Sequence, residues 1–181
     1  TYSGGFIHMF GKKVDSMEDL SGKAVAHEEY SSFYQSSLNK ALGIQFRNYG
    51  EKSKEIVASE IISSTLYEIN DLPNISSLHL NRTEHRVFAR IIFISKKFLE
   101  KLPKDLREIV LDEAKRAGIF EREMAVKATE EYIKDLQRKG MTVNVWSEKQ
   151  KNVEMKKFQF MYDDFSRRFG KDIIKMINAI N

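Results

Sequence analysis

The four histidines of the chain are the residues best suited to catalysis or metal binding, and their spacing supports neither role. No two of them stand at the helical separation of two metal ligands: His8, His27, His79 and His85. The sequence contains no HExxH, no G-x-S-x-G and no glycine-rich phosphate loop. Because there is no cysteine, a disulfide, a thiolate metal site and a cysteine nucleophile are excluded. We therefore expect no catalytic residue, no metal and no cofactor, and a protein that is not an enzyme.

Carboxylates are frequent, but their arrangement is typical of solvated charge. Residues 27–29 (His-Glu-Glu) put a base beside two acids, yet three adjacent residues do not share a face of a helix or strand. Other paired acids fall on the solvent side of a predicted helix: Glu121 with Glu123, and Glu130 with Glu131. The net charge of +4 comes from interleaved basic and acidic residues. This pattern argues against a nucleic-acid partner.

The longest helical pattern, residues 97–140, is the element around which the rest of the chain is placed. Apolar residues recur at spacings of three and four from Leu102 to Leu136, and Gly140 ends the pattern. A helix of about 35 residues is roughly 50 Å long, which is longer than a small domain is wide. We predict that it spans two structural units. Unless another chain covers it, part of its apolar stripe should be exposed, around Ile109, Phe120 and Met124.

The first half of the chain predicts an α/β unit with a parallel strand pair. The expected elements are an extended segment at 1–14, a strand at 23–27, a helix at 31–43, a strand at 44–49, a helix at 51–60 and a strand at 61–69. Ser16 and Asp19 have the spacing of a capping box, and Gly43 is placed to end the first helix. A strand-helix-strand crossover therefore opens the fold.

The second half of the chain predicts one strand before the long helix and one after it. Residues 86–94 (RVFARIIFI) are apolar except for Arg86 and Arg90, which is typical of a strand buried on both faces. Residues 141–146 alternate as a strand should. Ser147 with Gln150 predicts a capping box for a helix that runs to Gly170, and a short amphipathic helix follows.

The order of several short motifs resembles the solute-binding proteins of tripartite ATP-independent periplasmic (TRAP) transporters. In chain order the motifs are SMEDLSGK at 16–23, Leu42-Gly43, Tyr49-Gly50-Glu51, residues 85–94 followed by SKKF at 95–98, LPKDL at 102–106 and GMTV at 140–143. The resemblance covers nearly the whole chain but only the C-terminal part of the family's fold. We expect most of the family's first lobe to precede Thr1, so that the chain is a truncated or divergent member.

The resemblance implies an α/β fold: a periplasmic-binding-protein-like second lobe with a mixed sheet, a long spanning helix and C-terminal helices. It divides the chain into a ligand-lobe segment, residues 1–85, and residues 86–181, which hold the returning hinge strand, the long helix and the C-terminal helices of the other lobe. It also implies an extracytoplasmic, periplasmic receptor whose signal peptide has been removed. Such a receptor binds a small organic anion, usually a carboxylate, and delivers it to TRAP membrane permease subunits.

The positions of the family's carboxylate-clamping arginines hold apolar residues here, namely Ile7 and Ala26. The candidate ligand-binding residues that remain are Tyr49, which matches an aromatic residue of the family's pocket, and Arg47, His27 and Tyr67. Loss of the clamp leaves the ligand's identity open. It also favours an alternative: a degenerate binding-protein scaffold that acts as a protein-interaction or oligomerising module, hiding strand 86–94 in a homodimer or swapped oligomer.

Overall fold

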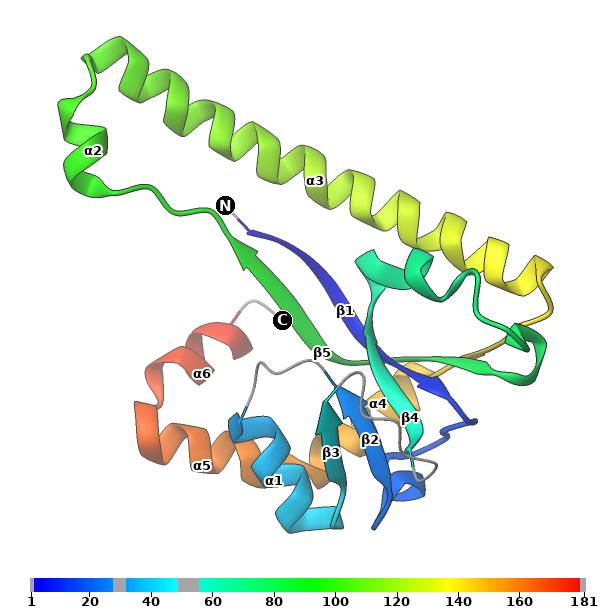
Figure 1. Ribbon diagram of the computed structural model, residues 1–181. Coiled ribbons are helices and arrows are strands. Elements are labelled where there is room, and N and C mark those ends of the chain that lie inside the picture. The colour runs from blue at the N-terminus through cyan, green and yellow to red at the C-terminus, as the bar shows by residue number, and fades with distance from the viewer. Residues whose placement is uncertain (1, 28–31, 49–55, 180–181) are drawn as a thin grey trace.

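The computed structural model describes residues 2–27, 32–48 and 56–179, which form a mixed six-stranded sheet flanked by helices (Figure 1). The strands are β1 (Tyr2–Gly11), β2 (Ala24–His27), β3 (Gln45–Asn48), β4 (Ile56–Ile62), β5 (His79–Ile91) and β6 (Thr142–Val145). Their order across the sheet is β3-β2-β4-β1-β5-β6. Strand β1 is antiparallel to both of its neighbours, while β2 is parallel to β3 and β4, and β5 is parallel to β6.

Helices connect these strands and complete the chain. They are η1 (Met17–Leu20), α1 (Ser32–Leu42), η2 (Ser63–Ile69), η3 (Ile75–Ser77), α2 (Lys96–Lys101), α3 (Lys104–Arg138), α4 (Glu148–Lys157), α5 (Gln159–Phe169) and α6 (Asp172–Asn178). The predicted capping boxes are confirmed. The Asp19 carboxylate accepts the backbone N–H of Ser16 at 3.0 Å, and Gln150 Oε1 accepts that of Ser147 at 2.9 Å.

The predicted strand-helix-strand crossover is confirmed as β2-α1-β3. Strands β2 and β3 pair in parallel, with Val25 opposite Phe46. Helix α1 ends where Gly43 takes a φ of +67°, which an L residue with a side chain rarely adopts. The N–H of Gly43 donates to the carbonyl of Asn39 at 2.8 Å and so closes the last turn of the helix.

The predictions for residues 51–69 were wrong over 56–60 and 63–69, whereas residues 61 and 62 form a strand as predicted. Instead of a helix, residues 56–60 belong to β4, which pairs with β2 on one side and β1 on the other. These partners are distant in sequence, and their backbone pairing outweighs the weak local preference. The predicted strand at 61–69 ends at Ile62, where Thr65 Oγ1 donates to the Ile62 carbonyl at 3.0 Å and the chain enters η2.

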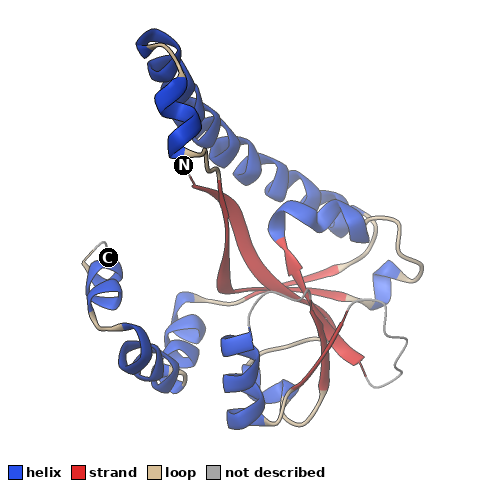
Figure 2. Ribbon diagram, turned by 60° about the vertical axis from the view of Figure 1, so that its left-hand side comes forward, coloured by secondary structure: helices blue, strands red, loops and turns tan. Residues whose placement is uncertain are grey.

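The long helical pattern is present but begins later than predicted. Proline disfavours the helical conformation of the residue before it, so Leu102 is extended and separates α2 from the 35-residue α3. Ile133 and Leu136, near the C-terminal end of α3, are buried against Leu80 of β5 and its neighbours. The N-terminal part of α3 stands away from the sheet (Figure 2). The expected exposure is confirmed for Ile109, Phe120 and Met124.

Strand β5 differs from its prediction in extent and in burial. It begins at His79, ends at Ile91, and leaves Val87 and Ile91 exposed, so it is not buried on both faces. The predicted boundary between 85 and 86 falls inside this strand. The division into residues 1–85 and 86–181 stays a prediction, and relative movement of the two parts would bend β5.

A buried polar anchor joins the ends of the central strands to the C-terminal helices. Asn81 is fully buried, accepts the N–H of Val14 at 2.9 Å and donates to the carbonyls of Met9 and Lys12. The indole Nε1–H of Trp146 donates to the Val14 carbonyl at 2.8 Å. Trp146 then packs in one core with β1, β2 and α1. These contacts fix the start of α4 beside β5.

Candidate functional site

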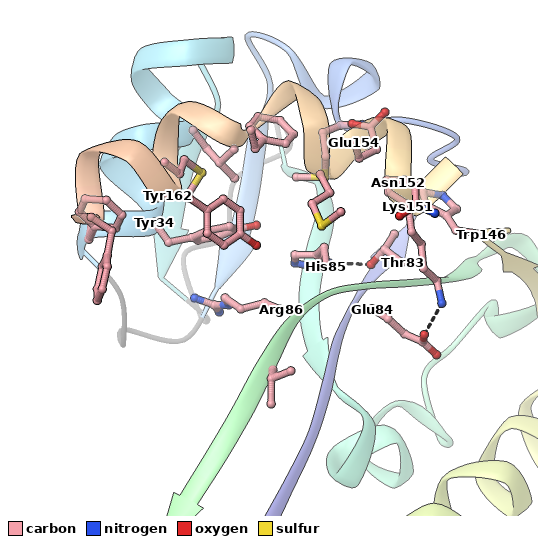
Figure 3. Close-up of a pocket in the computed structure, with 18 of the residues that line it drawn as sticks. Tyr34, Thr83, Glu84, His85, Arg86, Trp146, Lys151, Asn152, Glu154 and Tyr162 are labelled. Atoms are coloured by element: carbon pink, nitrogen blue, oxygen red, sulfur yellow. Dashed lines mark hydrogen bonds and ion pairs between the residues drawn. The ribbon is translucent and has the colours of Figure 1, made fainter. Parts of the chain in front are cut away.

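A cavity of about 800 Å³ is lined by residues of α1, β5 and the C-terminal helices α4 to α6 (Figure 3). Its walls are mainly apolar and include Phe33, Leu38, Trp146, Phe158, Phe165 and Ile174. Its polar residues are 83–86 of β5, Glu148, Lys151, Asn152 and Glu154 of α4, and Tyr34 and Tyr162. A concave, mostly apolar site with few polar groups is the usual form of a small-molecule pocket.

Residues 83–86 reach the cavity because β5 bends where it passes β1. Ile7 is opposite Arg86 and Met9 is opposite Asn81, so residues 82–85 are extra residues without partners on β1. Glu84, inside this segment, has a φ of +48°, an uncommon conformation for a residue with a side chain. Its carboxylate forms ion pairs with Arg82 and Lys151, which hold the bend in place.

A buried ion pair lies at one end of the cavity. Glu60 of β4 is 4% exposed, and its Oε2 accepts a hydrogen bond from Arg86 Nη2 at 2.8 Å. His85 Nε2 lies 3.3 Å from Glu60 Oε1, and His85 Nδ1 lies 2.6 Å from Thr83 Oγ1. The guanidinium carbon of Arg86 sits 4.6 Å from the centre of the Tyr34 ring. Tyr34, His85 and Arg86 thus form one polar group in contact with the cavity (Figure 3).

Burial and nearby charge set the protonation of this region. Burial opposes ionisation of Glu60, but its interactions with His85, Arg86 and His27 outweigh that effect and lower its pKa. Burial, reinforced by Glu60, raises the pKa of Tyr34 well above its ordinary value, so the phenol keeps its proton. Burial, together with His85, Arg82 and Lys151, lowers the pKa of His8 from 6.5 to about 3. His8 is therefore neutral at physiological pH.

The predicted ligand-binding residues are spread over the fold. Tyr49 lies outside the described residues. His27 ends β2, is buried beside Gln35, and is close enough to Glu60 to affect its pKa. Arg47 of β3 donates to Gln45 Oε1 at 2.8 Å, and Tyr67 of η2 is exposed next to Tyr132. None of the three described candidates lines the cavity, and their role in binding stays a prediction.

The clamp positions that carry Ile7 and Ala26 lie in the middle of the sheet. Ala26 is buried in β2 between β3 and β4. Ile7 is the direct partner of Arg86 across β1 and β5. The register therefore places Arg86 on the strand next to a position where the resemblance led us to expect an arginine. Sequence analysis did not identify Arg86 as a site residue, although it stands out as a charge at the start of an apolar run.

The mixed sheet and the long helix together form the fold of a lobe of a solute-binding protein, and the cavity lies in this lobe. The chain belongs to the bacterial extracellular solute-binding protein family 7, whose model matches residues 52–168. Members of this family are solute-binding proteins of TRAP type. The chain is also 26% identical over 124 residues to an uncharacterised protein of Haemophilus influenzae, with 66% of this chain and 34% of that protein covered.

Solved structures of TRAP periplasmic solute-binding proteins share the fold. That from Sulfurospirillum deleyianum, with bound succinate, has a TM-score of 0.75 at 23% identity and covers 99% of this chain and 62% of its own. The structure from Ochrobactrum anthropi, with its C-terminus bound in the ligand-binding pocket, has a TM-score of 0.84 at 18% identity, and the match covers 99% of this chain and 58% of that one. The structure from Desulfovibrio salexigens, with bound orotic acid, has a TM-score of 0.76 at 14% identity, and the match covers 98% of this chain and 60% of that one. The chain thus spans about three fifths of these relatives and about a third of the Haemophilus protein.

Within residues 2–27, 32–48 and 56–179, no helix combines the length and apolar character needed to cross a membrane. In the same part of the chain, no three side chains of His, Cys, Asp or Glu come together as a set of metal ligands.

Proposed function

We propose that this chain is the ligand-holding part of an extracytoplasmic receptor, which binds a small organic solute through an anionic carboxylate and delivers it to a TRAP membrane permease. The observation that carries this proposal is the guanidinium of Arg86 at the wall of the cavity. An arginine presents several N–H donors in a planar fork that matches a carboxylate. Family membership and the small organic acids bound by the relatives support the same assignment.

The proposed contact has room for a ligand even though Arg86 already pairs with Glu60. That pair uses Nη2 of the guanidinium, and the side chain of Arg86 stays 21% exposed. The ring of Tyr34 supports one side of the guanidinium and limits its movement. A ligand carboxylate would approach the donors that Glu60 does not occupy. No catalytic step is required of any residue in this role.

Calorimetric titration of the 181-residue chain with a panel of organic acids, including succinate and orotate, tests the proposal. At least one acid should bind, and Arg86→Lys should weaken its binding about 10- to 100-fold, because the charge is kept but the two-pronged hydrogen bond is lost. Arg90→Gln is the matched control, since Arg90 is an exposed arginine on the same strand, and should bind normally. A panel in which no organic acid binds, or equal binding by the Arg86 variant, contradicts the proposal.

A second function, a protein-interaction or oligomerising module, is favoured by one specific observation. The chain exposes large apolar side chains at the end of β5 and just beyond it, with Ile91 62%, Ile92 57% and Phe93 84% exposed. Contiguous apolar surface of this kind is uncommon on a monomer. Phe120 and Val126 of α3 are also exposed apolar side chains.

Sedimentation velocity over a range of protein concentrations tests this second function. Self-association should appear as a rise in sedimentation coefficient with concentration, and Phe93→Ser should reduce it because it removes the most exposed apolar ring in the segment. Leu72→Ser, a change of an exposed apolar residue elsewhere on the fold, should leave the association unchanged. A monomer at every concentration contradicts the module.

A further inference from the structure

The cavity has long apolar walls and one cationic group, Arg86, that can contact a ligand. Lys151, the other basic residue that lines it, is bound to Glu84 and lies 3.0 Å from Glu148. Arg86 is less fully engaged. Among the residues that the structure describes, its buried Nε–H has no hydrogen-bond partner. Because Nε itself is shielded from the cavity, a ligand carboxylate would contact the part of the Arg86 side chain that stays 21% exposed.

The wall beyond Arg86 is mainly apolar, although Asn152 of α4 and Tyr162 of α5 also line the cavity. Phe33 and Leu38 come from α1, and Phe158, Met161 and Phe165 come from the α4–α5 region. A dicarboxylate or a sugar acid would bury a further charge or several hydroxyls against these side chains without hydrogen bonds, which is unfavourable. An alkyl or aryl body would instead lose contact with water and gain packing contacts.

We propose that the cavity binds an amphipathic monocarboxylate, in which the carboxylate contacts Arg86 and an apolar chain of several carbons lies along α1, α4 and α5. This inference rests on the proposed function and names the class of ligand within it. Tyr34 contacts both parts of such a molecule, because its ring lines the cavity and lies under the guanidinium of Arg86. Figure 3 shows Tyr34, His85 and Arg86 grouped on one side of the site and Trp146 and Lys151 on the other.

Calorimetric titration with straight-chain alkanoates from butanoate to decanoate, each kept below its micelle concentration, tests the inference. The dissociation constant should fall about fourfold for each added methylene until the cavity is filled. Succinate should bind more weakly than hexanoate, because its second carboxylate would meet an apolar wall. Hexylamine, which has the same chain and the opposite charge, should not bind.

A pair of methionine variants locates the apolar chain. Met155 lines the cavity and is half exposed, so Met155→Trp narrows the cavity without disturbing the core. This variant should weaken decanoate at least tenfold and leave butanoate nearly unchanged. Met176→Trp, at an exposed position of α6 away from the lining, should bind the whole series as the unaltered chain does.

The outcomes separate this inference from the proposed function. If succinate binds and longer alkanoates bind no better than butanoate, the receptor role stands and the amphipathic ligand is wrong. If chain length matters but Met155→Trp and Met176→Trp behave alike, the ligand lies elsewhere and the assigned cavity is wrong. If no acid of either kind binds, both proposals are wrong.

Discussion

Replacing Glu60 by alanine should lower the free energy of unfolding by about 3 kcal/mol. The reason is that Arg86 and His85 both contact the Glu60 carboxylate, at 2.8 and 3.3 Å, in a site where Glu60 is 4% exposed. Removing one partner of a buried ion pair leaves the other charge uncompensated, at a cost of about 3–5 kcal/mol. Partial exposure of Arg86 places the expected value at the low end of this range. Urea denaturation of the full chain measures it.

Two further variants make the Glu60 result interpretable. Glu108→Ala removes an exposed carboxylate that lies 3.9 Å from Lys104, and it should cost less than about 0.5 kcal/mol. Combining Glu60→Leu with Arg86→Met removes both charges and should recover most of the lost stability. A loss for Glu60→Ala no larger than that for Glu108→Ala would show that the buried pair does not stabilise the fold.

Acidification from pH 7 to pH 5 should destabilise the protein by about 2 kcal/mol through His8 alone, whose pKa falls from 6.5 to about 3 on folding. Between these two values the unfolded chain binds a proton that the folded chain does not, so stability rises with pH. The contribution is complete above pH 6.5 and is lost progressively toward pH 3. Unfolding free energies measured in urea at several pH values give the slope.

The carboxylates with lowered pKa act in the same direction but at lower pH. In the unfolded chain both carboxyl groups have a pKa of 4.5. The stability that Glu60 and Glu18 contribute is present above this pH and is lost as the pH falls below it. The slope between pH 7 and 5 therefore reports mainly on His8. His8→Gln should flatten it, whereas His79→Gln, at a partly exposed position, should leave it in place. An unchanged slope in His8→Gln would contradict the assignment.

Local sequence signals predicted the elements that depend on local structure. Gly43 marked the end of α1, and Ser147 with Gln150 marked the start of α4, because caps involve residues three or four positions apart. The apolar stripe from Leu102 to Leu136 predicted α3 and its exposed half. The mixed α/β fold came from the resemblance, which rests on the order of several short motifs along the chain.

Strand β4 and the ion pair depend on partners that the local sequence does not reveal. Residues 56–60 become a strand because β1 and β2 lie on either side. Glu60 and Arg86 are 26 positions apart and meet across the sheet. One signal did exist, since Glu60 is the single charge among residues 56–62 and Arg86 begins an apolar run, and opposite charges on buried strands are expected to pair. The bend that brings residues 83–86 to the cavity has no comparable local signal.

The bend at residues 82–85 gives β5 two kinds of surroundings along one continuous backbone. Before the bend, β5 lies between β1 and β6 in the body of the sheet. Beyond it, within the described part of the chain, residues 87–91 pair with residues 2–6 of β1 alone and form a two-stranded ribbon. Such a ribbon has little stability of its own, and the strand leads from it into α2 and α3 (Figure 1).

This single strand therefore belongs to two cooperative units, which can open at different free energies. The half held by Asn81 and Leu80 opens only when the core unfolds, because both side chains are fully buried. Because the two-stranded part has fewer partner strands, we expect it to open at a lower free energy than the core. If only the part of β5 beyond the bend opens, the cavity wall stays intact as far as Arg86, where the two units meet.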